Sequence, residues 1–168
     1  MKVFIAGARA VKILDSVAID RLTTICKNQL DIIVGDCYGV DSAVQRFCAN
    51  LPYNKVTVFA SNGKVRNNIG HWPVQSIPVE SSLKGFEFHR QKDIAMAKDA
   101  NFGFMIWDGK SKGTYQNIIT LLDMKKPVAV YLSQSKTLFR LKPDDDPSVL
   151  LVKTKTVPSG SEQQLSFF

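Results

Sequence analysis

Apolar runs and helical patterns alternate along most of this chain, and the alternation limits the fold more than any other feature of the sequence. Five of the runs are short and continuously apolar, as is typical of parallel strands that are buried on both faces. They lie at residues 3–6, 32–34, 56–59, 102–106 and 128–132. Strands that alternate with helices in this way favour right-handed crossovers. We therefore expect a doubly wound, three-layer α/β sandwich with a mostly parallel sheet of five or six strands.

Amphipathic stripes between these runs predict the helical layers. Apolar residues recur three and four positions apart, the spacing that places them on one face of a helix. The stripes predict helices at residues 18–26, 40–51, 86–99 and 114–125. Asp15 or Ser16 is expected to cap the first helix. Phe86, Phe88 and Met96 in the third helix are interpreted as core residues.

The 168 residues of the chain are the length of one domain. We expect residues 1–133 to form the α/β unit and residues 134–168 to form an extension with a flexible tail. The segment 61–85 contains at most one short strand, at 74–78. We interpret this segment as an insertion or lid, because loops of this length are usually functional or mobile. Residues 149–152 are predicted to add an edge strand.

Positive charge is in excess, with 22 lysines and arginines against 15 aspartates and glutamates and a formal net charge of +7. Such an excess favours anionic partners, among them nucleotides, nucleic acids and acidic lipids. The basic residues are scattered rather than gathered in one run. This distribution favours a small phosphorylated ligand over a polynucleotide.

The cysteines, the histidines and the apolar segments argue against further classes of protein: disulfide-rich, metal-binding, exported and membrane-spanning proteins. Three cysteines without a C-x-x-C pair argue against a disulfide framework and against a zinc site. His71 and His89 have no partner at metal-ligand spacing, so we expect neither a metal nor another cofactor. The sequence contains no signal peptide and no apolar run long enough to cross a membrane. We therefore expect a cytoplasmic protein without membrane association.

Candidate ligand-binding residues follow the predicted strands, because ligands of doubly wound sheets bind beyond the carboxyl ends of the strands. After the first strand, Gly7 would let a ligand approach the backbone and Arg9 would supply a fixed positive charge. The full G-x-G-x-x-G fingerprint is missing, which argues against an NAD site. A plain tight turn is the alternative interpretation.

The loop after the second strand carries two carboxylates between glycines. Asp41 is expected mainly to cap the following helix. Gly35 and Asp36 are expected at the ligand, where Asp36 would bind sugar hydroxyls or orient a polar base. A turn-forming aspartate explains Asp36 nearly as well.

The strongest candidate is the glycine- and lysine-containing turn between the strand at 102–106 and the fourth helix. Free backbone N–H groups at Lys112, Gly113 and Thr114, the Thr114 hydroxyl and the positive end of the helix dipole would together bind a phosphate. The turn is not a Walker A motif. Its other candidate ligand-binding residues are Asp108, Gly109 and Ser111. Loops of this composition also serve only to start helices.

The sequences GDCYGVD at 35–41 and DGKSKGTYQN at 108–117 together resemble the SLOG superfamily. This Rossmann-like group contains the DprA-type and LOG-type proteins, and the resemblance spans residues 2–132. LOG-type relatives carry a P-G-G-x-G-T-x-x-E loop preceded by an R-K-x-x-M helix. Residues 92–96, which include Lys92, stand where that helix would lie, and Gly113 and Thr114 stand at the Gly-Thr pair.

The resemblance implies that the protein binds a nucleotide or nucleotide-derived small molecule, for sensing or sequestration. Its phosphate would lie at Gly113 and Thr114, and its sugar or base near residues 35–41. The alternative is an N-glycosidase, phosphoribohydrolase or deoxyribosyltransferase-like enzyme.

The catalytic glutamate of these relatives is replaced here by Asn117. Cleavage of an N-glycosidic bond builds positive charge on the sugar, which a carboxylate stabilises and an amide does not. Asp108, Asp36 or Asp93 would have to supply that carboxylate. Whether the ligand is turned over therefore stays open at this point.

Two residues of the segment 61–85 are further candidates. Arg66 would bind phosphate and Trp72 would stack on a base. Surface solvation for Arg66 and local packing for Trp72 are equally simple explanations.

The C-terminal residues resemble the QL[SD]LF peptide with which bacterial replication and repair proteins bind the sliding clamp. The residues concerned are Gln164, Leu165, Phe167 and Phe168. Leucine and a phenylalanine pair on a flexible end would anchor in an apolar groove. A tail that packs on its own domain or on a second copy in a homo-oligomer is the alternative.

Overall fold

The protein is built around one central sheet. The computed structural model of the protein describes residues 1–155. Seven strands form one sheet in the order β4-β3-β2-β1-β5-β6-β7. The strands are β1 Lys2–Gly7, β2 Asp31–Val34, β3 Val56–Ser61, β4 Val74–Ile77, β5 Phe102–Trp107, β6 Val128–Leu132 and β7 Thr137–Leu141. Every neighbouring pair is parallel except β6 and β7. The structure confirms the doubly wound α/β class, with one more strand than expected.

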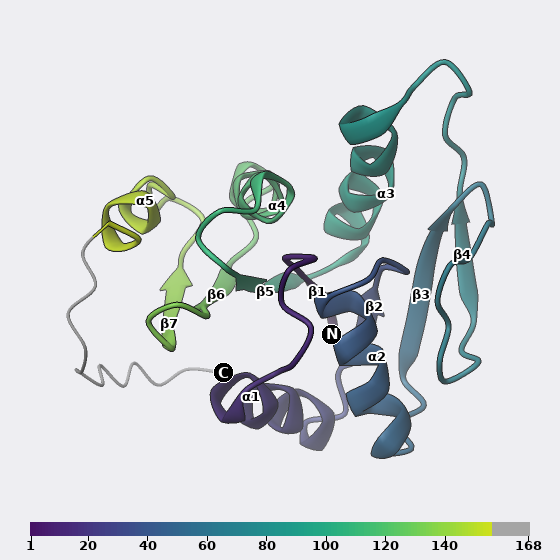
Figure 1. Cartoon of the computed structure of the whole chain (residues 1–168), viewed down its shortest axis with the longest axis horizontal. Coiled ribbons are helices and arrows are strands. Elements are labelled where there is room, and N and C mark those ends of the chain that lie inside the picture. The colour runs from purple at the N-terminus through teal and green to yellow at the C-terminus, as the bar shows by residue number, and fades with distance from the viewer. Residues whose placement is uncertain (156–168) are drawn as a thin grey trace.

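Helices cover both faces of this sheet, as Figure 1 shows. They are α1 Ser16–Lys27, α2 Val40–Asn50, α3 Gly85–Asp99, α4 Lys112–Asp123 and the short α5 Val149–Lys153. Alternate residues of β1 enter the two cores: Val3 and Ile5 pack with α1 and α2, whereas Phe4 and Ala6 pack with α3, α4 and α5. The three layers follow from this alternation, because successive side chains of a strand point to opposite faces. Within residues 1–155, no helix is long and apolar enough to cross a membrane.

Helix starts and core assignments agree in part with the expectations. Asp15 caps α1 by accepting a hydrogen bond from the Ala18 amide, and the Tyr131 hydroxyl donates to the same carboxylate. Met96 lies in the core, as expected. The core assignments of Phe86 and Phe88 are wrong, because Phe86 is 39% exposed and the half-buried Phe88 belongs to neither core cluster. Phe86 lies in the first turn of α3, where it lines the cavity described below and Lys112 Nζ lies 4.9 Å from its ring centroid.

Trp72 does not serve as a base-stacking platform. Its indole is buried, and its Nε1 donates to the backbone oxygen of Tyr53 at 2.9 Å. Local packing, the simpler explanation, is therefore the correct one. The strand expected at 74–78 is present as β4, which extends the sheet beyond β3.

The C-terminal part differs most from the expectations. The edge strand predicted at 149–152 is wrong, because these residues form α5, whose Leu150 packs into the core beside α4. The edge position belongs to β7, which pairs antiparallel with β6. A run of four apolar residues fits a strand and one turn of helix equally well, so the sequence alone did not separate them.

The order of the strands creates a crevice beside β1. The connections lead from β1 to β2 and on to β4 on one side, and from β5 to β7 on the other. The loops that follow β1 and β5 therefore diverge at the carboxyl edge of the sheet. This reversal of direction is where open α/β sheets bind their ligands.

Candidate functional site

A cavity of about 580 Å³ lies beyond the carboxyl ends of β1, β2 and β5. Its walls come from the loops after these strands and from the facing sides of α3 and α4. The expected site residues that line it are Gly7, Arg9, Asp41, Lys92, Asp108, Ser111, Gly113, Thr114 and Asn117. The expected residues Gly35, Asp36, Arg66, Gly109 and Lys112 do not contribute to the lining. The fold thus brings together the three loops that the sequence singled out.

The N-terminus of α4 opens onto this cavity. Ser111 is the N-cap, and its Oγ accepts hydrogen bonds from the Thr114 amide and hydroxyl. The expectation of a free Thr114 amide is therefore wrong, because the cap occupies it. Within residues 1–155, the amides of Lys112 and Gly113 have no acceptor, and a Cβ on Gly113 would meet no atom within 4 Å. Two N–H groups and open space remain for an anion.

Asp108 shapes the turn before α4. Its Oδ1 accepts from the amides of Lys110 at 3.0 Å and Ser111 at 2.8 Å. This is the arrangement with which aspartate stabilises a turn. The Asp108 carboxylate thus holds the entry to the helix in place.

Gly7 and Gly35 are needed for packing within the protein, not only for the approach of a ligand. A Cβ on Gly7 would lie 2.2 Å from the Ile106 oxygen and 2.7 Å from Val40 Cγ2. A Cβ on Gly35 would lie 2.3 Å from Asp41 Oδ2. Both positions exclude a side chain because neighbouring elements pack against the backbone there.

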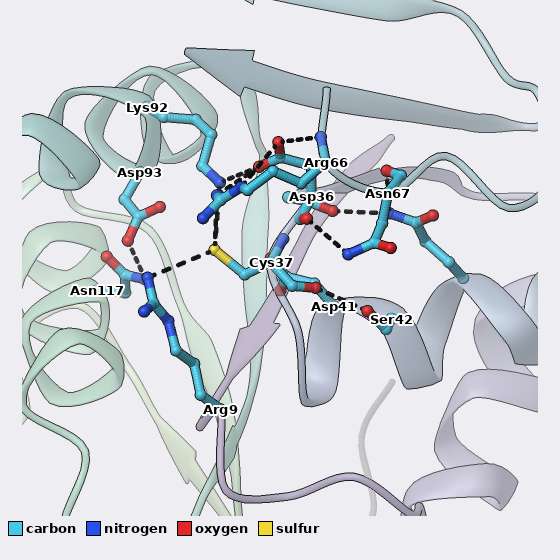
Figure 2. Close-up of polar contacts among 12 residues, drawn as sticks. Arg9, Asp36, Cys37, Asp41, Ser42, Arg66, Asn67, Lys92, Asp93 and Asn117 are labelled. Carbon is cyan, nitrogen blue, oxygen red and sulfur yellow. Dashed lines mark hydrogen bonds and ion pairs between the residues drawn. The ribbon is translucent and has the colours of Figure 1, made fainter. Parts of the chain in front are cut away.

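Asp36 is the centre of a buried ionic cluster, which Figure 2 shows. The side chain is 1% exposed. Its Oδ1 accepts from Arg66 Nη2 at 2.8 Å and from Lys92 Nζ at 2.9 Å, and its Oδ2 accepts from the Arg66 amide and Nε. Burial alone would raise the pKa of Asp36, but the hydrogen bonds from Arg66 and the charge of Lys92 outweigh it and hold the pKa far below its usual range. Asp36 is ionised, and it joins the loop after β2 to the segment 61–85 and to α3.

Lys92 is a buried cation, 2% exposed, at the centre of several carboxylates. Burial acts to lower its pKa, but Asp41, Asp36 and Asp93 raise it above the ordinary value. The ammonium group therefore stays charged. Lys92 both contacts Asp36 and lines the cavity, so it connects the ionic cluster to the site.

Asp41 does not cap α2. The N-cap is Gly39, which has a φ of 80° and makes no side-chain cap, and Asp41 lies one position inside the first turn. Its Oδ2 accepts from the Cys37 amide at 3.1 Å. Burial raises the pKa of Asp41 to about 6, against the opposing effect of Lys92. Near neutral pH this carboxyl group exchanges its proton.

Cys37 is a site residue that the sequence analysis missed. Its sulfur lies 2.9 Å from Arg66 Nη2, 3.7 Å from Lys92 Nζ and 3.9 Å from Arg9 Nη2, and it lines the cavity. Burial and the nearby Asp41 raise its pKa, and the cations offset only part of that rise. The thiol is therefore neutral, and it contributes packing and weak hydrogen bonding. Its position directly after β2 was the only local signal.

Asp93 and Asn117 form a polar pair between α3 and α4. Asn117 Nδ2 donates to Asp93 Oδ2 at 3.1 Å. Burial raises the pKa of Asp93, although Lys92 and the bond from Asn117 oppose the rise. Asp93 is the one of the three suggested carboxylates that lies beside Asn117 on the cavity wall. Residues 1–155 contain no group of three or more histidine, cysteine or acidic side chains that could hold a metal ion.

The expected clamp-binding residues Gln164, Leu165, Phe167 and Phe168 lie outside the described residues.

Comparison with known proteins adds a fold relative. No family model matches the sequence, and no curated protein does. Among solved structures, DNA processing protein A from Helicobacter pylori matches with a TM-score of 0.63 and 16% sequence identity over 92% of this chain and 73% of that chain. That relative was described for its single-stranded DNA binding mode. Likeness at this identity establishes the architecture alone: the chain shares the Rossmann-like α/β fold of DNA processing protein A.

Proposed function

We propose that the protein binds a nucleotide or nucleotide-derived small molecule in the cavity, for sensing or sequestration. The observation that carries the proposal is the N-terminus of α4, where the Lys112 and Gly113 amides have no acceptor within residues 1–155 and Gly113 lines the cavity. Helix N-termini of this kind bind phosphate, because free N–H groups and the helix dipole both favour negative charge.

Arg9 supplies a second anion-binding group in the cavity lining. It is exposed, it contacts the Cys37 sulfur at 3.9 Å, and it forms no ion pair with a carboxylate in the part of the chain that the structure describes. Arg66 and Lys92, in contrast, are already paired with Asp36. Arg9 is therefore the better candidate for a charge-assisted contact to a ligand.

The size of the cavity favours a small molecule. Its volume of about 580 Å³ falls within the range of roughly 300 to 1,000 Å³ that small-molecule sites occupy. A single nucleotide fits such a volume. Single-stranded DNA, the ligand named for the fold relative, instead requires an open groove with stacking platforms.

The enzymatic alternative rests on two buried carboxyl groups. Asp41 and Asp93 both line the cavity, and burial raises the pKa of each, to about 6 for Asp41. A carboxyl group that titrates near neutral pH is suited to protonate a leaving base, and a second carboxylate would stabilise positive charge on a sugar. A nucleoside N-glycosidase is therefore the second candidate function.

Mass spectrometry and calorimetry test the proposal. Small molecules released by heat from the purified protein are identified first, and AMP, GMP, CMP, UMP and a dT oligomer are then titrated into the protein. We expect at least one mononucleotide to bind with a dissociation constant below 1 mM, a threshold of about 4 kcal/mol. Absence of heat from every mononucleotide, or binding of the oligomer alone, would contradict the proposal.

A further inference from the structure

The wall of the cavity contains a buried oxygen without a hydrogen-bond donor. Asn117 lies on α4 one turn beyond Gly113 and is 4% exposed. Its Nδ2 donates to Asp93, but its Oδ1 is buried and accepts no hydrogen bond from any group in residues 1–155. Buried polar atoms in native proteins are nearly always hydrogen-bonded. The missing donor therefore points to a group outside residues 1–155, and a ligand in the cavity would supply it.

Asp93 determines which end of the amide is left without a partner. When the Asp93 carboxylate is ionised, the form that the charge of Lys92 favours, it only accepts hydrogen bonds, so the NH₂ group of Asn117 faces it. A flipped amide would place two acceptor oxygens against each other. In the orientation that Figure 2 shows, Nδ2 faces Asp93 and Asn117 offers an acceptor to a ligand rather than a donor.

The spacing along α4 relates this oxygen to the anion site. Asn117 follows Gly113 by four residues, which at 1.5 Å per residue is about 6 Å along the helix axis. A ligand whose anionic group contacts the amides of Lys112 and Gly113 would place its next part beside Asn117. In a nucleotide, hydroxyl groups of the sugar and N–H groups of the base are the available donors.

We propose that Asn117 is a specificity-determining residue that accepts a hydrogen bond from an O–H or N–H group of the ligand, about one helical turn from the ligand's anionic group. Asp93 acts as a positioning residue for this contact, because it holds the amide in the orientation that presents the oxygen. The inference rests on the proposed nucleotide binding and deepens it. An anion without a donor at this distance gains nothing from Asn117.

Calorimetry on two matched variants tests the inference. Asn117→Leu removes the oxygen, and Gln116→Leu changes the neighbouring residue of the same helix, which does not line the cavity. The probes are AMP, GMP, CMP, UMP, ribose 5-phosphate and inorganic phosphate. Loss of one hydrogen bond predicts that Asn117→Leu weakens mononucleotide binding about tenfold, whereas Gln116→Leu changes it by less than about twofold. Inorganic phosphate is expected to bind both variants equally.

The probes separate the two sources of the donor. If ribose 5-phosphate loses affinity for Asn117→Leu as mononucleotides do, the sugar supplies the donor. If ribose 5-phosphate is unaffected while mononucleotides lose affinity, the base supplies it. Either result supports the inference, since the oxygen is then the acceptor in both cases.

Two outcomes would overturn it, and they are distinguishable. If the wild-type protein binds a mononucleotide and Asn117→Leu binds it as tightly as Gln116→Leu does, Asn117 has no such role and the proposed function stands. If the wild-type protein binds none of the probes, the proposed function fails and the inference fails with it. Thermal melting shows whether each variant is folded. If Asn117→Leu does not fold, Asn117→Ala is used instead, because it removes the same oxygen without adding volume.

Discussion

Replacement of Lys92 by methionine tests the buried ionic cluster that holds the site together. Methionine has a similar length and no charge, so the substitution removes the ammonium group and keeps most of the volume. Lys92 is 2% exposed, and its Nζ lies 2.9 Å from Asp36 Oδ1. Arg66 stays on Asp36, but Asp41 and Asp93 lose the buried cation that favours their ionised forms.

The expected loss is large for one residue. Removal of one partner of a buried ion pair costs about 3–5 kcal/mol. Here Asp36 loses one of its two cationic partners, and Asp41 and Asp93 lose the buried charge that favours their ionised forms. With a urea dependence of about 2 kcal/mol per molar, a loss of this size lowers the urea midpoint by about 1.5–2.5 M. Lys92→Met combined with Asp36→Asn removes both charges. The double variant no longer contains the buried carboxylate. We therefore expect its loss of unfolding free energy to be smaller, by about 1–3 kcal/mol, than the sum of the losses of the two single variants.

Equilibrium urea unfolding, followed by circular dichroism and tryptophan fluorescence, measures the four proteins of this cycle. Coincident transitions from the two probes establish that unfolding is two-state. A loss below about 1 kcal/mol for Lys92→Met would refute the reasoning, because it lies within the range of ordinary surface substitutions. Strictly additive losses in the double variant would refute it as well, since they would show that the two charges do not interact.

Three further predictions concern the cavity. Because burial raises the pKa of Asp41 to about 6, above an unfolded value of about 3.9, the folded protein holds a proton that the unfolded chain releases, so stability falls by about 2–3 kcal/mol as pH rises from 4 to 6. Urea midpoints across this range should show a smaller decline for Asp41→Asn, and equal declines in the two proteins would argue against the assignment. Gly113→Val points a side chain into open space at the anion site. The free energy of unfolding should therefore change by less than about 1 kcal/mol, while the mononucleotide affinity measured by calorimetry falls at least about tenfold. Unchanged affinity would count against the site. With an amide at Asn117, we expect chromatography to detect no free base from nucleoside monophosphates at high protein concentration. Base release by the wild-type protein would favour the glycosidase alternative, whereas release by Asn117→Glu alone would show that only the carboxylate is missing.

The sheet and the anion site could be predicted because their signals are local. Buried strands are continuous apolar runs, and the turn before α4 carries its glycine, lysine and hydroxyl residues within a few positions. The sequence therefore indicated the strand-to-helix junction at Gly113 before its surroundings were known. Only the Thr114 amide differs from the expectation, because it donates to Ser111 Oγ and is not free for a ligand.

The ionic cluster could not be predicted, because its members are distant in sequence. Arg66 and Lys92 lie 30 and 56 residues from Asp36, and only the fold brings them together. This is why Asp36 and Arg66, both expected at the ligand, prove to bind each other outside the lining of the cavity. The sequence predicts a helix cap at Asp41 because neither its packing against Gly35 nor its interaction with the charge of Lys92 has a local signature.

The most direct test of the account is a titration of the ¹⁵N-labelled protein with a binding mononucleotide, followed by amide NMR. Ligand oxygens at the N-terminus of α4 would hydrogen-bond the amides of Lys112 and Gly113, which have no acceptor among the described residues. The account predicts that these two amides show the largest chemical-shift changes, with smaller changes around Arg9 and Asn117. Saturable changes that cluster on another face of the domain, with Lys112 and Gly113 unmoved, would contradict it.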